Sequence, residues 1–335
     1  MIRIAINGFG RIGKTFLRAL MCDKETTQKI KVVAINIGPA KRDLIPYLFQ
    51  YDTTMGKYEG KVKVEGDELV IDDHRIKILT ELDPAALPWK SLEIDWAVEC
   101  SGRFTARADA NKHLQTGAKK VLISAPAHDE DVTIIPGVND HLFDAQKHAI
   151  VSLGSCTTNA VTPMLKIMHE TFGIEHAMMT TIHAYTNSQV LLDVQGEDER
   201  RSRAAALNII PTTTGAMKVV TKILPELNGR IEGLALRVPV ADVSLVDLVV
   251  ITKQEVTADT INQAFMLASK NSLKHIVDVC QLPLVSSDFI GNSHSVIIDS
   301  ELTSVTGAHM SKVFGWYDNE WGYSCRLKDF LKVCG

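Results

Sequence analysis

Short runs of aliphatic and β-branched residues alternate with amphipathic stretches through the first half of the chain. Apolar runs of this length are typical of buried strands, and the stretches between them have the periodicity of helices. The pattern predicts strands at residues 2–6, 31–35, 96–99, 120–124 and 150–152, and helices at residues 11–23 and 106–117. Strands that alternate with helices in this way indicate an α/β domain with a doubly wound parallel sheet.

The pattern changes after residue 156. A predicted helix at residues 157–172 precedes four stretches in which apolar and polar residues alternate, at residues 177–183, 233–239, 243–253 and 295–298. Alternation predicts strands with one covered face, so we expect an α+β domain with an antiparallel sheet. Residues 190–206 are charged and irregular and predict a loop. No linker separates the two patterns, which places the domain boundary beside Cys156.

Length and composition limit the classes of partner. A chain of 335 residues is long enough for two hydrophobic cores. With 45% apolar residues, 23% charged residues and a net charge of −4, it reads as a globular protein without a primary nucleic-acid or membrane partner. The N-terminus enters a strand directly and has no signal-peptide pattern. Six cysteines without a CxxC pair or zinc-ligand spacing indicate a reducing, cytoplasmic compartment and no metal site.

A glycine-rich turn follows the first predicted strand and opens a helix. Gly8, Gly10 and Gly13 fit the GxGxxG pattern in its required context. The glycines allow a tight turn and close approach of a pyrophosphate, and the helix N-terminus supplies N–H donors and a favourable dipole. The alternative is a tight turn without a ligand, but the position within a βαβ unit favours a Rossmann-type dinucleotide site.

The end of the second strand departs from the usual dinucleotide pattern. A carboxylate that binds the adenosine ribose is expected there, but the chain has Ile37, followed by Lys41 and Arg42. A 2′-phosphate would be repelled by a carboxylate and attracted by two cations, so this chemistry favours NADP. Solvated surface charges remain the alternative interpretation.

Cys156 is the candidate nucleophile. It lies where a predicted strand meets a helix, and a helix N-terminus is expected to lower the pKa of a thiol. The hydroxyls of Ser155 and Thr157 flank it and are able to bind an anion. His183 ends a later strand and is the candidate base that activates the thiol. Taken alone, either residue is equally well read as structural, and the spacing does not show that they meet.

The chain resembles the glyceraldehyde-3-phosphate dehydrogenase family from end to end. The motifs that carry the resemblance are residues 7–13, 155–159, 183–186, 208–211, 214–216, 224–229, 237–239 and 316–324. The resemblance implies a homotetramer, a dinucleotide-binding domain at residues 1–155 with 320–335, and a catalytic domain at residues 156–319. It implies oxidation of D-glyceraldehyde 3-phosphate to 1,3-bisphosphoglycerate through a Cys156 thioester, with hydride transfer to NAD or NADP.

The resemblance also implies roles for individual residues. Cys156 and His183 would be catalytic, and Asn319 would orient the nicotinamide carboxamide. Further cofactor contacts would come from Asn7, Gly8, Gly10, Arg11, Ile12, Gly13 and Ser124, with Arg11 and Ile12 holding the pyrophosphate through their N–H groups. The substrate phosphate would be bound by Thr186 and Arg237, and the attacking phosphate by Ser155, Thr157, Arg203, Thr214 and Gly215.

Three questions stay open at this point. Val194 and Gln195 stand where the family often has Gly-Pro, and this loop looks more like that of NADP-using or dual-specificity enzymes, which leaves the choice between glycolysis and gluconeogenesis undecided. The closest alternative activity is erythrose-4-phosphate dehydrogenase, which hydrolyses the thioester; the donors at residues 212–216 favour phosphorolysis instead. A non-enzymatic binding protein would be expected to have lost Cys156 or His183, and both are present.

Overall fold

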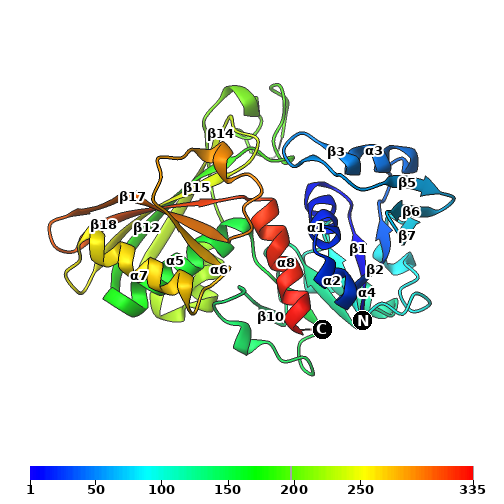
Figure 1. Ribbon diagram of the computed structural model, residues 1–335, viewed down its shortest axis with the longest axis horizontal. Helices are drawn as coiled ribbons and strands as arrows, with labels where there is room; N and C mark the ends of the chain where they lie inside the picture. Colours follow the sequence, from blue (N-terminus) through cyan, green and yellow to red (C-terminus); the bar gives the residue numbers. More distant parts are fainter. Residues whose placement is uncertain (197, 335) are drawn as a thin grey trace. The chain divides into compact units, whose positions relative to one another are not determined.

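Two units make up the chain in the computed structural model, which describes residues 1–196 and 198–334 (Figure 1). One unit comprises Met1–Gly154 and Ser324–Gly335, and the other comprises Ser155–Tyr323. Two residues covered by the expectations above, Glu197 in the loop and Gly335 at the C-terminus, lie outside the described residues. Within the described residues, the structure has no helix that combines the length and the apolar character needed to cross a membrane.

The first unit contains a nine-stranded sheet of the predicted doubly wound kind. The five predicted strands and two predicted helices are present as β1 (Ile2–Asn7), β2 (Ile30–Asn36), β8 (Trp96–Glu99), β9 (Lys120–Ile123), β11 (Ile150–Ser152), α1 (Arg11–Met21) and α4 (Arg107–Gln115). These strands pair in parallel, which confirms the predicted fold class.

The remaining elements of this unit were not predicted. They are α2 (Lys24–Lys29), α3 (Ile45–Gln50), β3 (Tyr51–Asp52), β4 (Gly56–Lys57), β5 (Val62–Glu65), β6 (Glu68–Ile71), β7 (His74–Leu79), β10 (Val132–Thr133) and the later part of α8 (Trp321–Cys334). Strands β5 to β7 form an antiparallel meander whose last strand joins β2 in parallel. Charged residues interrupt the apolar positions of β5 (VKVE) and β7 (HRIKIL), and the apolar run of β6 (ELVI) is only three residues long, so none of them has the long apolar run that marks a buried parallel strand.

The order of the strands places a topological switch point at β1. The sheet runs β10-β11-β9-β8-β1-β2-β7-β6-β5, so the chain leaves β1 toward β2 on one side and returns to β8 on the other. A crevice forms where the strand order reverses, outside the carboxyl ends of the strands. Gly8 follows directly after β1, so the glycine-rich turn lies at this point.

The second unit contains a seven-stranded sheet in the order β13-β14-β12-β15-β18-β17-β16. Its strands are β12 (Ile174–Ala184), β13 (Ile210–Thr212), β14 (Ile231–Val238), β15 (Ser244–Thr252), β16 (Val277–Cys280), β17 (Val296–Thr306) and β18 (Met310–Tyr317). Four neighbouring pairs are antiparallel as expected, but β12–β14 and β16–β17 are parallel. The sheet is therefore mixed, because alternation predicts a strand and its covered face but not the direction of its partner.

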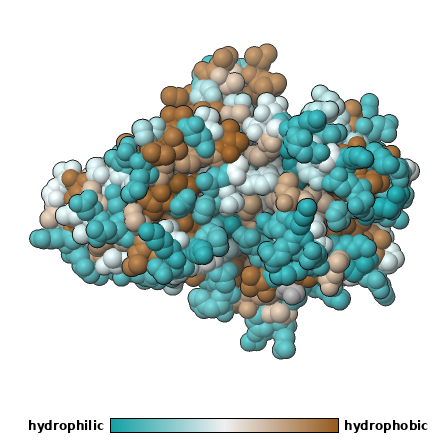
Figure 2. Space-filling model, in the orientation of Figure 1, coloured by the Kyte–Doolittle hydropathy of each residue, from teal (hydrophilic) through white to brown (hydrophobic). Residues whose placement is uncertain are grey.

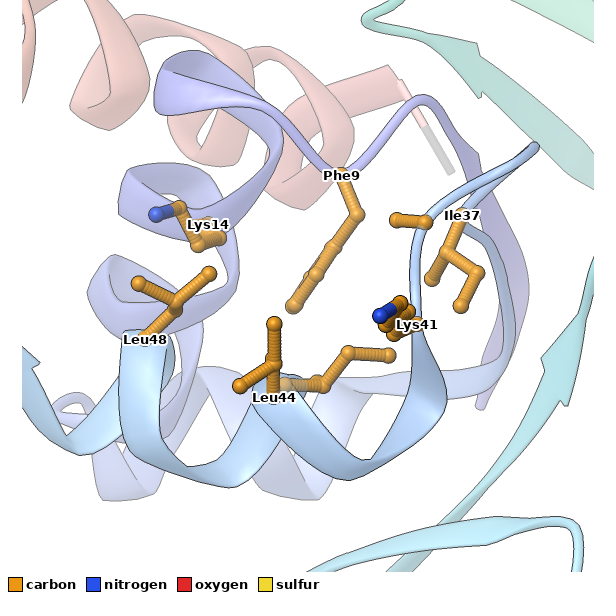
Figure 3. Close-up of a pocket in the computed structure, with 8 residues that line it drawn as sticks. Phe9, Lys14, Ile37, Lys41, Leu44 and Leu48 are labelled. Carbon is orange, nitrogen blue, oxygen red and sulfur yellow. The ribbon is translucent and has the colours of Figure 1, made fainter.

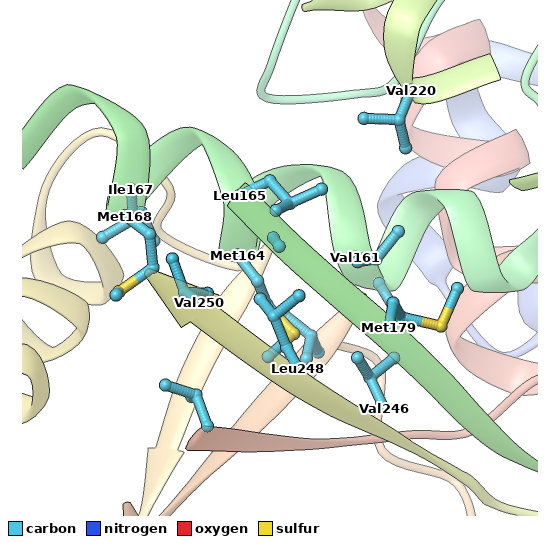
Figure 4. Packing of buried hydrophobic residues seen from close by; sticks show 14 of the residues in the cluster. Val161, Met164, Leu165, Ile167, Met168, Met179, Val220, Val246, Leu248 and Val250 are labelled. Carbon is cyan, nitrogen blue, oxygen red and sulfur yellow. The ribbon is translucent and has the colours of Figure 1, made fainter. Parts of the chain in front are cut away.

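Helix α5 (Cys156–Phe172) packs on this sheet and is buried along most of its length, with α6 (Ala216–Ile223) and α7 (Ala258–Lys270) beside it. Figure 4 shows side chains of α5, including Val161 and Met164, against Met179 of β12 and Leu248 of β15. Burial of each such side chain contributes about 1.5–3 kcal/mol. This packing anchors the helix whose first residue is Cys156.

Candidate active site

The glycine-rich turn of the first unit is shaped by close backbone contacts. Gly8 has φ +96°, and a Cβ there would clash with the backbone of Ser101, while a Cβ on Gly13 would clash with the carbonyl of Gly8. A Cβ on Gly10 would meet nothing within 4 Å. Gly8 and Gly13 are thus required by the turn itself, whereas Gly10 borders the open space into which a ligand fits.

The N-terminus of α1 is suited to a pyrophosphate. Its cap residue, Gly10, offers no side-chain cap, and the first turn carries no acidic residue. The helix therefore offers no side-chain cap and no acidic residue of its own at this end, and its dipole favours an anion there. These residues fit a dinucleotide.

Other predicted cofactor residues bind within the protein instead. Asn7 accepts a hydrogen bond from Asn36 at 2.7 Å and donates to the buried carboxylate of Glu99. The Ser124 hydroxyl donates to the Glu99 carbonyl at 2.9 Å, and the Arg11 guanidinium pairs with Asp52. These side chains bind the turn to the neighbouring strands, and their contacts within the protein give no evidence of a ligand.

A pocket lies between this turn and α3 (Figure 3). Its lining is apolar apart from two lysines: Phe9, Lys14, Ile37, Ala40, Lys41, Leu44, Ile45 and Leu48. Ile37 and Lys41 lie here as the sequence led us to expect, whereas Arg42 is not part of the lining and Lys14 was not predicted. No carboxylate lines this pocket, so a negatively charged group meets cations and no acid there.

In the second unit, Cys156 is the first residue of α5. The Ser155 hydroxyl caps the helix by accepting a hydrogen bond from the Thr158 N–H at 3.1 Å. The first turn contains no acidic residue, so the positive end of the helix dipole acts on the thiol unopposed.

Two parallel strands bring a histidine and an arginine to this thiol. His183 of β12 and Arg237 of β14 are direct partners in the register, near the carboxyl ends of both strands. His183 Nε2 lies 3.5 Å from the Cys156 Sγ. On the other side of the ring, Nδ1 lies 2.6 Å from the Ala184 carbonyl and 2.7 Å from an Arg237 nitrogen, which also donates to that carbonyl at 2.9 Å.

These contacts decide the state of the imidazole. Burial, followed by the charge of Arg237, lowers the pKa of His183 to about 3, while the Ala184 carbonyl acts in the opposite direction. The ring is therefore neutral near neutral pH. The Arg237 N–H and the Ala184 carbonyl both lie within hydrogen-bond distance of Nδ1, so the contacts admit either tautomer of the ring. In the tautomer whose Nδ1–H donates to Ala184, the lone pair of Nε2 faces the sulfur, which is the arrangement a general base requires.

The expectation that the helix N-terminus lowers the pKa of Cys156 is wrong. Burial raises the pKa of the thiol, although the charge of Arg237 and the N–H groups of Thr157 and Cys156 oppose it. The sequence reveals a helix N-terminus but not the depth at which the thiol is buried. A thiol in this environment needs a neighbouring base to take its proton before it acts as a nucleophile.

A buried tyrosine hydroxyl ties the two catalytic elements together. Tyr317 of β18 contacts the hydroxyl of Thr157 on α5 at 3.0 Å and that of Thr181 on β12 at 2.8 Å. The Thr157 hydroxyl is thus engaged with Tyr317, which weakens its assignment to an anion site. No sequence pattern singles out Tyr317.

Asn319 is also held in place. Its side-chain oxygen accepts a hydrogen bond from the Ser244 hydroxyl at 2.7 Å, and this hydroxyl in turn accepts one from the Ala184 N–H at 3.1 Å. Ser244 was not predicted. The bond fixes which end of the Asn319 amide is the oxygen and leaves the NH₂ group to donate elsewhere.

Comparison with known proteins shows which family the chain matches. Residues 2–107 match the family described as "Glyceraldehyde 3-phosphate dehydrogenase, NAD binding domain", and residues 155–319 match its "C-terminal domain". Glyceraldehyde-3-phosphate dehydrogenase 2 of Bacillus subtilis (strain 168) is 47% identical over 99% of this chain and 96% of its own length. Glyceraldehyde-3-phosphate dehydrogenase 2 of Streptomyces avermitilis is 48% identical over 100% and 98%, and the enzyme of Geobacillus stearothermophilus is 46% identical over 98% and 96%.

The chain belongs to the glyceraldehyde-3-phosphate dehydrogenase family. It is an oxidoreductase with an NAD-binding domain, and the family resemblance inferred from its motifs is confirmed.

Chemistry of the glyceraldehyde-3-phosphate dehydrogenase kind requires anion sites near the thiol. Arg237 is suited to one, because its Nε is buried and has no hydrogen-bond partner among the described residues. Thr186 follows β12, and its hydroxyl contacts Ser188 at 3.0 Å. Gly215 caps α6, whose first turn has no acidic residue, and the Thr214 hydroxyl accepts from the Ala216 N–H at 3.2 Å.

Arg203, which the family resemblance assigns to the attacking phosphate, is engaged within its own loop. Its side chain is 61% exposed and pairs with Asp193 at 2.6 Å within the loop. Arg201 instead donates to the Thr212 hydroxyl at 2.9 Å, and its charge contributes to lowering the pKa of Arg237. The sequence alone does not distinguish Arg201 from Arg203. The conformation of the loop does, because it brings the charge of Arg201 to bear on Arg237.

Proposed function

We propose that this protein oxidises D-glyceraldehyde 3-phosphate with NAD or NADP and inorganic phosphate to give 1,3-bisphosphoglycerate. The observation that carries the proposal is a group of three side chains at the ends of β12 and β14 and at the start of α5. The group consists of the Cys156 thiol, the neutral imidazole of His183 at 3.5 Å from it, and the buried guanidinium of Arg237, whose Nε has no hydrogen-bond partner among the described residues. A nucleophile, a base and an anion site are what thioester chemistry on a phosphorylated aldehyde requires.

The reaction starts when the Cys156 sulfur attacks the aldehyde carbon and His183 Nε2 takes the thiol proton. The thiohemiacetal oxyanion is stabilised by the protonated Nε2 and by the N–H of Cys156 at the start of α5. The dinucleotide, when bound, supplies the acceptor for the hydride that leaves this carbon. A thioester on Cys156 results, and an oxygen of inorganic phosphate attacks its carbonyl carbon, releasing the acyl phosphate and the Cys156 thiolate.

The remaining residues bind and orient. Arg237 and Thr186 are assigned to the substrate phosphate, and Arg201, Thr214 and Gly215 to the attacking phosphate. Asn319, held by Ser244, donates its NH₂ group to the nicotinamide carboxamide. Ser155 caps α5 and keeps its N-terminus in place.

Cofactor reduction at 340 nm with glyceraldehyde 3-phosphate tests this function. We expect reduction that depends on added inorganic phosphate. Phosphate-independent reduction with erythrose 4-phosphate, together with none on glyceraldehyde 3-phosphate, would contradict the proposal and assign the protein to the hydrolytic alternative.

Acceptance of NADP is part of the proposal. It is supported by Ile37 and by the placement of Lys41 and Lys14 in the lining of one pocket. We expect Lys41→Ala to raise the KM for NADP about tenfold, the effect of losing one charge-assisted hydrogen bond, and to leave that for NAD unchanged. Arg42→Ala is the matched control, since Arg42 lies outside the pocket lining. Equal KM values for NADP in the two variants would refute the 2′-phosphate role of Lys41.

The choice between Arg201 and Arg203 for the attacking phosphate gives a second matched pair of variants. We expect Arg201→Ala to raise the KM for inorganic phosphate by about 10- to 150-fold, because a charge-assisted bond is worth about 1.5–3 kcal/mol. Arg203→Ala removes only an exposed ion pair and should change this KM less than twofold or so. Steady-state kinetics at varied phosphate would reverse the assignment if the larger effect followed Arg203.

Assembly as a homotetramer is proposed from the surface of the loop after β12. Its exposed apolar side chains include Leu191, 85% exposed, with Leu192, Val194, Leu207 and Ile209 (Figure 2). Apolar residues gathered on one exposed loop mark an interaction surface. The described cysteines are all free, which supports a reducing, cytoplasmic location.

A further inference from the structure

The carboxylate of Glu99 is buried at the carboxyl end of β8, beside the glycine-rich turn. One of its oxygens, Oε1, accepts hydrogen bonds from the Ser101 hydroxyl and from the Ser101 backbone N–H, the latter at 2.6 Å. The other oxygen, Oε2, accepts one from the Asn7 NH₂ group and lies 3.1 Å from His113 Nε2. Four groups of the protein thus surround the two oxygens.

His113 is the fourth donor to this carboxylate. Its other ring nitrogen, Nδ1, lies 2.9 Å from the indole nitrogen of Trp89, and an indole N–H is able only to donate. Nδ1 therefore carries no proton, so the ring is neutral and its proton lies on Nε2, facing Glu99. Because all four groups donate, the contacts require an oxygen pair that only accepts, which is the ionised carboxylate.

Asn36 fixes the direction of the Asn7 amide in the same way. It accepts from the Glu81 N–H at 2.9 Å and donates to the Glu81 carbonyl at 2.8 Å, so its NH₂ group is the end that also faces the Asn7 Oδ1, at 2.7 Å. The Asn7 NH₂ group is thereby turned to Glu99. Asn7 is the register partner of both Asn36 and Glu99, so these hydrogen bonds form one row along the carboxyl ends of β8, β1 and β2.

The row borders the glycine-rich turn. Asn7 directly precedes Gly8, whose N–H donates to the Asn36 carbonyl at 2.9 Å. A Cβ on Gly8 would lie 2.4 Å from the backbone nitrogen of Ser101, so the turn and Ser101 are in close contact. Glu99 therefore binds both sides of the narrow space that Gly8 occupies.

Stability alone does not account for a carboxylate at this place. Removing a charge from water is costly, and replacing buried charged groups by well-packed apolar side chains often leaves a protein equally stable or more stable. A buried polar network instead favours one arrangement of its members, because any other arrangement leaves donors without acceptors. Here that arrangement includes the position of Gly8 and of the turn that leads into α1.

We propose that Glu99 is a positioning residue for the dinucleotide: its carboxylate fixes Asn7 and Ser101 and so holds the turn that binds the pyrophosphate. This inference rests on the proposed function, which requires a dinucleotide at this turn. A glutamine at position 99 would present one oxygen and one NH₂ group to four donors. Either the Asn7 amide would then turn over and lose its bond to Asn36, or Ser101 would move away from Gly8.

Calorimetric titration of full-length Glu99→Gln with NAD tests the inference. We expect the Kd for NAD to rise about 10- to 100-fold, since displacement of a positioned group by about 1 Å costs up to about 10²-fold. The KM values for glyceraldehyde 3-phosphate and for phosphate should change less than about twofold, because the residues assigned to them belong to the other unit. Glu68→Gln is the matched control: it makes the same change on β6 of this sheet, removes a surface ion pair with Arg75, and should leave the Kd for NAD unchanged.

A second pair of variants reaches Glu99 from the side of α4. His113 is fully buried, so its side chain has no exposed atom with which to contact a cofactor. His113→Phe removes one of the four donors and should raise the Kd for NAD about three- to tenfold, the effect of losing one hydrogen bond. His113→Gln supplies an amide donor in place of Nε2 and an amide oxygen for Trp89, so its Kd should return toward that of the wild type.

Binding is measured below the melting temperature of each variant, where a loss of stability alone leaves the Kd of the folded protein unchanged. A Kd for Glu99→Gln within about twofold of the wild-type value, or equal Kd values for the two His113 variants, would overturn the positioning role. The His113 pair decides the question by itself if Glu99→Gln does not fold. Absence of NAD binding by the wild type would refute the proposed function instead.

Discussion

The Cys156→Ser variant should lose phosphate-dependent cofactor reduction almost completely, by at least about 10⁴-fold in kcat, as removal of a catalytic nucleophile does elsewhere. The burial that already raises the pKa of the thiol would act on a hydroxyl as well. A serine hydroxyl is far harder to deprotonate than a thiol, and a neutral imidazole is too weak a base to compensate for the difference.

The loss must be shown to come from chemistry and not from folding. Cys156 occupies the first turn of α5, where serine fits without a change of backbone, so the melting temperature should stay within a few degrees of that of the wild type. Mass spectrometry after mixing with substrate should detect an acyl adduct on the wild type only. A Cys156→Ser enzyme with turnover near the normal value would show that another residue is the nucleophile.

The His183→Asn variant should be slower by about 10² to 10⁴ in kcat, the range for removal of a general acid–base group. Asparagine retains a polar side chain beside Arg237 but has no lone pair placed to take the proton from the sulfur at 3.5 Å. Stopped-flow measurement of the first turnover separates this step from product release.

The pH dependence supplies the control for His183. Its pKa is lowered to about 3, so the ring stays neutral as the pH falls from 8 to 6, and kcat/KM should show no limb near the ordinary histidine value of 6.5. Activity should instead increase as the pH rises, because the pKa of the thiol is raised. A limb near 6.5 that disappears in His183→Asn would contradict the buried neutral imidazole.

The parts of the fold that the sequence predicted are those with a strong local pattern. Strand β1 is an apolar run, and the glycine spacing from Gly8 to Gly13 directly after it is typical of a tight turn between a strand and a helix. Strands β5 to β7 escaped prediction because charged residues interrupt β5 and β7, and the apolar run of β6 is only three residues long. The parallel pairing of β12 with β14 was not predicted either, although it sets His183 opposite Arg237.

The residues of the candidate site also differ in whether a local sequence pattern predicts them. Cys156 and His183 were identified from their residue types and positions, but their separation depends on how α5 packs on β12. Arg201 and Arg203 have the same residue type and differ in their partners, Thr212 and Asp193, because of the conformation of the loop. No local sequence pattern predicts that conformation. Burial is likewise a property of the folded chain, which is why the direction of the Cys156 pKa shift was mispredicted.

The hydroxyl of Tyr317 has a consequence for how this site changes over evolution. It serves Thr157 and Thr181 at once, at 3.0 and 2.8 Å, in a buried place. Loss of the tyrosine hydroxyl alone removes the shared partner of two buried threonine hydroxyls, at a cost of about 1–3 kcal/mol for each hydroxyl left unsatisfied, whereas replacing all three by apolar groups of similar shape is nearly neutral. Positions 157, 181 and 317 should therefore covary among descendants of this sequence, with the three hydroxyls kept together or lost together.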